Sequence, residues 1–136
     1  MTIQKTILLF AACCLLGGCA TSPEAEDQVE QAVEVLYQDA LKTAIGGEPE
    51  DAASKFEEVE RQHPYSKLAT RAQVMAAWSF YDANQYSRAI AALERFIELN
   101  PVDPLVDYAY YLKALCLYEQ IVDVERDAEM TRLALE

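Results

Sequence analysis

A segment in the middle of the chain recurs, without a gap, 37 residues further along. Residues of the same kind meet at this spacing several times: Ala40, Ala77 and Ala114; Ala52 and Ala89; Glu57 and Glu94; Pro64 and Pro101. Repetition at a period of about 20 to 50 residues is typical of stacked supersecondary units, each of which buries its apolar face only against its neighbours. The repeat therefore predicts a solenoid, a fold whose surface usually binds a partner rather than performing chemistry.

Each unit of the repeat has the hydrophobic pattern of two helices. Apolar residues recur every three or four positions, which is the spacing of one helix face. This spacing predicts helices over about 29–45, 49–62, 67–83, 87–99 and 103–122, with a further apolar periodicity from residue 130. Gly46-Gly47 is expected to end the first helix, and Ser66 can cap the third.

Small residues where helices cross, and a proline at the end of the second helix, make the units resemble tetratricopeptide repeats. The second unit matches that pattern most closely, at Ala77, Tyr81, Tyr86, Ala89, Leu93 and Pro101. Phe96 departs from the pattern, which has a small residue there, and in the first unit Pro49 stands where Tyr86 stands in the second. The resemblance implies an all-α fold, a tetratricopeptide-like helical-hairpin solenoid with two repeats and the start of a third.

The repeats divide the chain into units of about 29–65, 66–102 and 103–136. The last unit is incomplete, because Ala134 is the natural counterpart of Ala52 and Ala89, and only two residues follow it. A helix cannot bury its apolar face alone. We therefore expect the sequence to be the N-terminal piece of a longer protein.

The N-terminus resembles a bacterial lipoprotein signal. Residues 1–18 hold one lysine, an apolar run too short to span a bilayer, and the small residues that precede Cys19. The resemblance implies that Cys19 is lipidated and that residues 19–28 form an acidic flexible linker. Because Ala20 follows rather than an aspartate, it also implies an anchor in the outer membrane, facing the periplasm. The alternative is an ordinary signal peptide followed by a chance cysteine.

The charge of the chain excludes several kinds of partner. Its 11 Lys and Arg against 23 Asp and Glu give a formal net charge of −12. Cleavage of residues 1–18, which include Lys5, would change the net charge to −13. Such a surface disfavours nucleic acid, and it disfavours attraction to anionic lipid through a basic patch.

Little in the sequence supports catalysis, a metal or a cofactor. His63 is the only histidine, and there is no glycine-rich phosphate loop or nucleophile elbow. Cys116 lies in an apolar helical run, which favours a buried small hydrophobe over the alternative of a redox role. We expect a protein that is not an enzyme and has no cofactor or metal.

The first helices of the units place aromatic side chains in rows. Positions one and two turns apart point the same way and, in this architecture, line the inner face. The rows are Tyr37, Leu41 and Ala44; Val74, Trp78 and Tyr81; and Tyr111, Leu115 and Tyr118, with Glu34, Arg71 and Tyr108 one turn earlier. An aromatic groove suits an extended peptide whose own aromatic side chains alternate.

Core packing is the alternative for any one of these aromatic residues. Tyr37, Trp78 and Tyr81 suit a groove best, since amphipathic aromatics tolerate half-exposure. The residues assigned instead to the core between helices are Phe56, Tyr86, Leu93 and Phe96. The candidate peptide-binding residues are Tyr37, Arg71, Val74, Trp78, Tyr81, Tyr108, Tyr111 and Tyr118.

The signal, the acidic linker and the repeats together resemble the BamD (ComL) family, outer-membrane lipoproteins of the β-barrel assembly (BAM) machinery. The segments that carry the resemblance are Leu36-Tyr37-Gln38, Phe56, His63-Pro64-Tyr65-Ser66, Gln85-Tyr86-Ser87-Arg88-Ala89 and, most specifically, Arg95 to Tyr111. The resemblance implies five repeats. It also implies that the N-terminal repeats recognise the C-terminal targeting strand of unfolded outer-membrane proteins. Our own hypothesis is that Arg71 meets the carboxylate of that strand.

The same resemblance implies the partners. These are a BamA-like barrel subunit and other assembly lipoproteins, mainly through C-terminal repeats beyond this sequence, together with unfolded outer-membrane proteins. The alternatives are another periplasmic repeat lipoprotein, such as a secretin pilotin or a cell-envelope coordinator, and an envelope enzyme with a repeat accessory domain.

Overall fold

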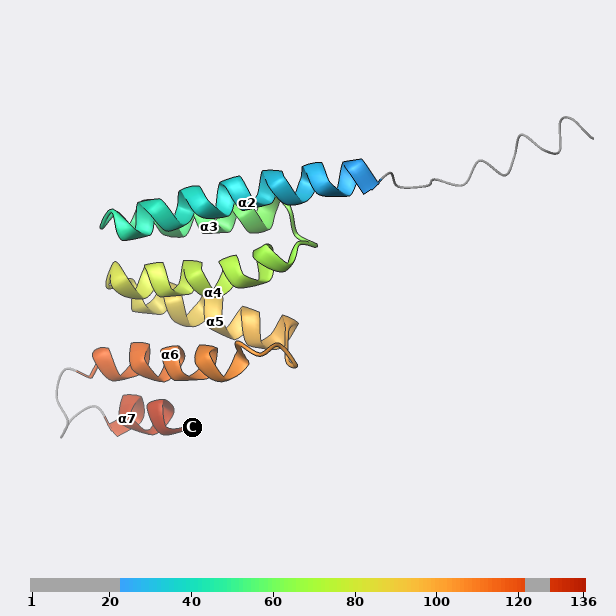
Figure 1. The fold of residues 1–136 in the computed structure, drawn as a ribbon. Coiled ribbons are helices and arrows are strands. Elements are labelled where there is room, and N and C mark those ends of the chain that lie inside the picture. Colours follow the sequence, from blue (N-terminus) through green and yellow to red (C-terminus); the bar gives the residue numbers. More distant parts are fainter. Residues whose placement is uncertain (1–22, 122–127) are drawn as a thin grey trace, which may run out of the picture.

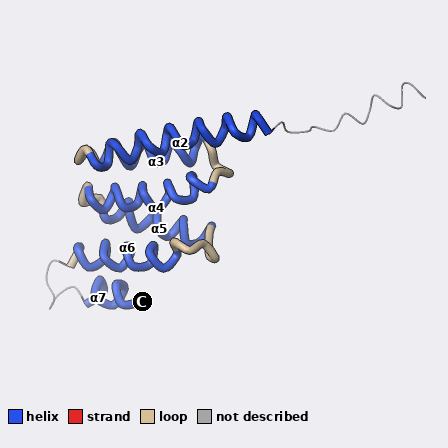
Figure 2. The backbone as a smooth tube through the Cα atoms, viewed as in Figure 1, coloured by secondary structure: helices blue, strands red, loops and turns tan. Residues whose placement is uncertain are grey.

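The structure, a computed structural model, describes residues 23–121 and 128–136. Its helices are α2 (Pro23–Ile45), α3 (Pro49–Gln62), α4 (Lys67–Asp82), α5 (Tyr86–Leu99), α6 (Val106–Glu119) and α7 (Ala128–Leu135). Successive helices pair into hairpins that stack in one direction (Figure 1), and the described part of the chain contains no strand (Figure 2). The predicted all-α, tetratricopeptide-like solenoid is confirmed. No helix in these two ranges combines the length and the apolar character needed to cross a bilayer.

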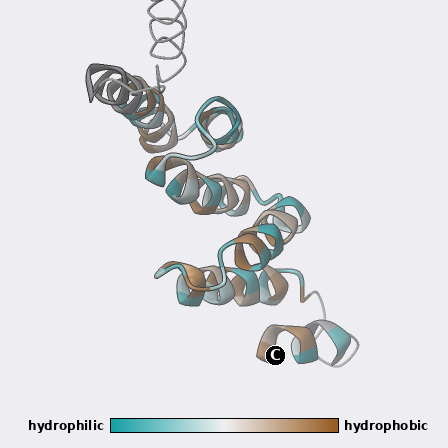
Figure 3. Cartoon of the chain, turned by 90° about the vertical axis from the view of Figure 1, so that its right-hand side faces the viewer, coloured by the Kyte–Doolittle hydropathy of each residue, from teal (hydrophilic) through white to brown (hydrophobic). Residues whose placement is uncertain are grey.

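The helices form two layers. One layer holds α2, α4 and α6, and the other holds α3, α5 and α7 (Figures 1 and 3). Each helix contacts the next in sequence, and α4 also contacts α2 and α6 within its own layer. Hydrophobic and hydrophilic residues alternate around the helices (Figure 3), as expected for helices with a packed and a solvated face. The first helices of the three units therefore lie side by side.

The turns form where the sequence predicts them. Gly47, after α2, has a φ of 79°, a left-handed conformation that glycine adopts without steric cost. Asn84, between α4 and α5, has a φ of 58°, which asparagine tolerates better than most residues. Ser66 caps α4, because its side-chain oxygen accepts a hydrogen bond from the Leu68 N–H at 3.1 Å.

Alanines mark the points where the helices cross. Ala40, Ala52, Ala77 and Ala89 are all 0% exposed, so the backbones approach closely at each of them. Ala114, which shares the phase of Ala40 and Ala77, is only half-buried because it faces a hollow beside α7. The small residues of the repeat thus set the spacing of the stack.

Larger side chains fill the spaces between these crossings. Phe56, Leu93 and Phe96 are 0% exposed, which confirms their assignment to the core. Tyr86 is half-buried and packs against the same core. The core is therefore continuous through the hairpins.

The bounds of two helices differ from the prediction. α2 begins at Pro23, so residues 23–28, which we assigned to a flexible linker, are helical. A proline fits the first position of a helix, where its fixed φ is helical and no N–H is needed, and acidic residues after it suit the positive end of the helix. α6 ends at Glu119, earlier than expected. The signal segment and Cys19 lie outside the described residues.

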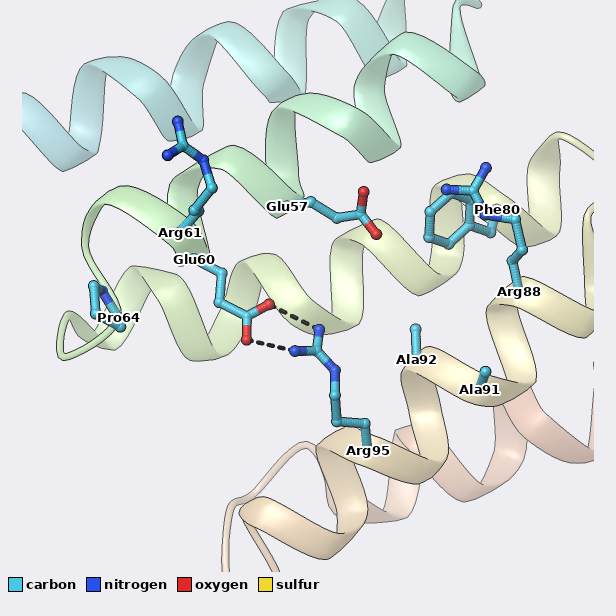
Figure 4. A pocket seen from close by; sticks show the side chains of 9 residues that line it. All are labelled: Glu57, Glu60, Arg61, Pro64, Phe80, Arg88, Ala91, Ala92 and Arg95. Carbon is cyan, nitrogen blue, oxygen red and sulfur yellow. Dashed lines mark hydrogen bonds and ion pairs between the residues drawn. The ribbon is translucent and has the colours of Figure 1, made fainter.

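A polar network joins the first two hairpins on the outer side of the stack. Glu60 of α3 accepts two hydrogen bonds of 2.9 Å from the guanidinium of Arg95 on α5 (Figure 4). The Glu60 carboxylate also accepts a hydrogen bond of 2.8 Å from the Gln73 side-chain NH₂ on α4. The side-chain oxygen of Gln73 in turn accepts a hydrogen bond of 3.2 Å from the Asn100 side-chain NH₂. One carboxylate therefore links three helices with bidentate geometry.

The alanine crossings predict an asymmetry between two identical substitutions. Ala77→Leu should lower the free energy of unfolding by about 1–3 kcal/mol, because the added carbons have no space at the crossing. Ala91→Leu, on the exposed side of α5, should change it by less than about 0.5 kcal/mol. Denaturant unfolding followed by circular dichroism measures both, and equal midpoints for the two variants would contradict the close packing at Ala77.

Candidate peptide-binding groove

The predicted groove residues come from the three helices of one layer. Tyr37 lies on α2, the residues Arg71, Val74, Trp78 and Tyr81 lie on α4, and Tyr108, Tyr111 and Tyr118 lie on α6. The stacking of hairpins brings these helices next to one another, since α4 contacts both α2 and α6. Residues that are far apart in sequence thus lie on neighbouring helices.

Their exposure separates groove from core. Trp78 and Tyr81 are half-buried against the core, as amphipathic groove residues should be. Val74 corrects our prediction, because it is 3% exposed and belongs to the core. The helical period identifies the side of the helix on which Val74 lies, but the close approach of neighbouring helices covers it. Of the residues predicted for the groove on α4, the aromatic ones are therefore the half-exposed ones.

Tyr37 connects the groove to the core of the first hairpin. Its ring packs edge-on against Phe56, with 5.5 Å between the centroids. Desolvation raises the pKa of the Tyr37 hydroxyl, the positive charge of Arg71 opposes this shift, and the negative charge of Glu34 adds to it. Tyr37 and Arg71, from neighbouring helices, thus lie close enough to interact electrostatically.

Tyr81 forms the other end of the row on α4. Its ring lies 5.7 Å from that of Tyr86, and its hydroxyl donates to Glu119 of α6 at 3.5 Å. The pKa of Tyr81 is raised, first by desolvation and then by the negative charge of Glu119. This contact joins α4 to the end of α6.

The tyrosines of α6 are the most exposed of the set. Tyr108 is 40% exposed, Tyr111 61% and Tyr118 64%. The rings of Tyr108 and Tyr111 lie 6.2 Å apart, and the pKa of Tyr108 is raised by desolvation and by Tyr111. Tyr111 and Tyr118 each line a hollow between α6 and α7, a neighbour that the row pattern did not include. The aromatic surface therefore continues past α4 toward the last helix.

Two further hollows were not predicted from the sequence. One, of about 390 Å³, lies where α4 and α6 begin and is lined by Lys67, Thr70, Arg71, Asp103, Pro104 and Leu105. The other, of about 690 Å³, lies on the outer side between α3 and α5 (Figure 4). There the guanidinium of Arg88 stacks over the ring of Phe80 at 4.0 Å, beside the Glu60–Arg95 pair. Glu60 and Arg95 are 35 residues apart, close to one repeat, which is the signal that could have placed them together.

Cys116 lies inside the stack, as its apolar surroundings predict. The side chain is 0% exposed, and burial raises the pKa of its thiol to about 11. The reactive thiolate is therefore rare at neutral pH. Within residues 23–121 and 128–136, no three His, Cys, Asp or Glu side chains are grouped so that they could hold a metal ion.

Comparison with known families bears directly on this stack of hairpins. A family model described as YfiO, outer membrane lipoprotein, matches residues 29–136. The chain belongs to this family. The resemblance inferred from the repeats and from the segment Arg95 to Tyr111 is thereby confirmed.

Three curated relatives of this chain are each named outer membrane protein assembly factor BamD. The protein of Caulobacter vibrioides is 42% identical over 132 residues, which are 96% of this chain and 43% of the relative. That of Rickettsia prowazekii is 35% identical over 120 residues, 88% of this chain and 47% of the relative. That of Neisseria gonorrhoeae is 32% identical over 122 residues, which are 87% of this chain and 46% of the relative. The chain thus spans less than half the length of these relatives.

The burial of Cys116 predicts slow thiol chemistry in the folded chain. In a variant whose Cys13, Cys14 and Cys19 are replaced by alanine, Cys116 should react with a maleimide at pH 8 at least roughly a hundredfold more slowly when folded than in denaturant, because the raised pKa alone removes that much thiolate. The control adds Val102→Cys, at a position 95% exposed, together with Cys116→Ala, and should react at full speed when folded. Fast labelling of folded Cys116 would contradict its burial.

Proposed function

We propose that this chain is the substrate-facing part of a non-enzymatic BamD-type lipoprotein of the β-barrel assembly complex in the outer membrane. Membership of the YfiO family supports this, and so does the name that its curated relatives share. The single observation that carries the proposal is that Tyr37 of α2 and Trp78 and Tyr81 of α4 are half-exposed aromatic residues in a chain of this family. Its role is to help fold and insert outer-membrane proteins.

The ligand of this face is the C-terminal targeting strand of an unfolded outer-membrane protein. An extended strand points alternate side chains to one side. Aromatic side chains on that side stack against Tyr37, Trp78 and Tyr81, where each contact stabilises the complex beyond simple burial. Tyr108, Tyr111 and Tyr118 extend the same surface along α6. Val74 contributes only by supporting the floor from below.

The remaining partners are the barrel subunit, other assembly lipoproteins and the membrane itself. The curated relatives are more than twice as long as the matched segment, so docking on a BamA-like subunit belongs mainly to repeats outside this sequence. Acyl chains on Cys19 hold the protein on the periplasmic side of the outer membrane, because several chains together exceed the weak hold of one. The acidic surface gives no basic patch for nucleic acid.

Removing the aromatic floor tests the proposed ligand. Trp78→Ala and Tyr81→Ala should each weaken the binding of a labelled barrel C-terminal peptide about tenfold, since each removes one stacking surface. Fluorescence anisotropy measures the dissociation constants. Tyr65→Ala is the matched control, because Tyr65 is fully exposed in the turn between α3 and α4. Unchanged affinity in both groove variants would show that the strand does not bind here.

The lipid anchor has its own test. In a Gram-negative host supplied with labelled palmitate, the chain should take up the label, and Cys19→Ala should abolish it and release the protein from the membrane fraction. Cys116→Ala should keep the label, because its thiol is buried. Labelling that survives Cys19→Ala would disprove this anchor and favour an ordinary signal peptide.

A further inference from the structure

Two cations lie together where the aromatic groove begins. Lys67 and Arg71 are one helical turn apart on α4, so their side chains share a face, and both are exposed. They line the hollow of about 390 Å³ together with Thr70 and the loop that leads into α6. Arg71 also lies seven residues, or two helical turns, before Trp78 on α4, so the two side chains share a face. This cation pair is therefore continuous with the aromatic floor.

Neither cation has a carboxylate partner among the described residues, although the chain is strongly acidic. The ion pairs there are Lys55–Asp39, Arg61–Glu58, Arg95–Glu60, Lys113–Glu94 and those of Arg132 with Glu129 and Glu136. Lys42 and Arg88 also lack an ion pair, but Arg88 lies on the outer side against Phe80 and Lys42 lines no hollow described above. Among the hollows described above, the one at the start of α4 is the only one that two such cations line.

Two carboxylates around this pair accept hydrogen bonds from their own segments. Asp103 accepts a hydrogen bond from the Leu105 N–H at 2.8 Å, which holds it to its own loop. Glu34 accepts a hydrogen bond of 2.7 Å from the side-chain NH₂ of Gln38 on its own helix. Lys67 and Arg71 consequently keep hydrogen-bond donors for a carboxylate that arrives from outside.

The opposite end of the groove carries negative charge. Asp82 is the last residue of α4, and Glu119 of α6 accepts the hydroxyl of Tyr81. Arg71 and Tyr81 are ten residues apart, about 15 Å along the helix axis, which an extended strand covers in about five residues. A strand that ends in a carboxylate therefore gains attraction in one direction along α4 and meets repulsion in the other.

We infer that Lys67 and Arg71 form a carboxylate-binding site that fixes the direction of the bound strand, with its C-terminus at the start of α4 and its preceding residues running toward Tyr81. The inference rests on the proposed function, which supplies the strand. It adds Lys67 as a specificity-determining residue, and it adds a direction that the aromatic row alone does not impose. Internal segments of an unfolded chain, which lack a terminal carboxylate, bind the same floor more weakly.

A pair of peptides that differ only at the C-terminus tests the site. The free acid of a barrel C-terminal peptide should bind the purified chain about fivefold more tightly than its amide, because two exposed charge pairs contribute modestly. The ratio should fall to about one in the Lys67→Gln/Arg71→Gln double variant, and toward one in high salt. Arg88→Gln is the matched control, since it removes an exposed, unpaired arginine from the other side and should leave the ratio unchanged.

The outcomes separate this inference from the proposed function. Equal affinity of acid and amide for the unmodified chain, with Trp78→Ala still weakening both, would overturn the carboxylate site and leave the groove standing. Failure of both peptides to bind would overturn the two together. A photo-crosslinker on the peptide N-terminus should label α4 and α6 near Tyr81 and Glu119, and labelling near Lys67 would overturn the direction.

Discussion

The close approach of helices at alanine is the constraint on which the rest of the structure depends. Where Ala40, Ala52, Ala77 and Ala89 meet their neighbours, no larger side chain fits, and each of them is fully buried. The distance between helices fixes how deep every other side chain lies. Phe56 is enclosed, and Trp78 is left half-exposed, because both sit on helices held at that spacing. The exposure of the aromatic residues thus follows from the spacing between the stacked hairpins.

The sequence predicts local features well, because the signals for them are local. Gly47 ends α2 and Ser66 caps α4 where expected, since a left-handed φ and a capping hydroxyl depend on one or two residues. The 37-residue phase also identifies α2, α4 and α6 as helices of one layer (Figures 1 and 3). It predicts Tyr37, Trp78 and Tyr81 for a groove, and the structure leaves all three half-exposed.

Depth and neighbours are what the sequence does not reveal. Val74 shares its face with Trp78, yet it lies in the core, because burial depends on how far the adjacent helices reach over it. Tyr111 and Tyr118 turn toward α7, whose position follows from packing rather than from the period. The sequence alone does not indicate a binding role for Lys67, because that role depends on the hollow that Lys67 lines and on its lack of an ion-pair partner among the described residues.

The bridge made by Glu60 has a mechanical consequence. Glu60 binds Arg95 and Gln73 at once, and its side chain is 20% exposed, while that of Arg95 is 50% exposed. These contacts, made to two helices of the second hairpin, oppose rotation of the first hairpin against the second. Within the described residues, no bridge of the same geometry joins α5 to α7. We therefore expect rotation between neighbouring hairpins to be easier near α6 and α7 than between α3 and α5.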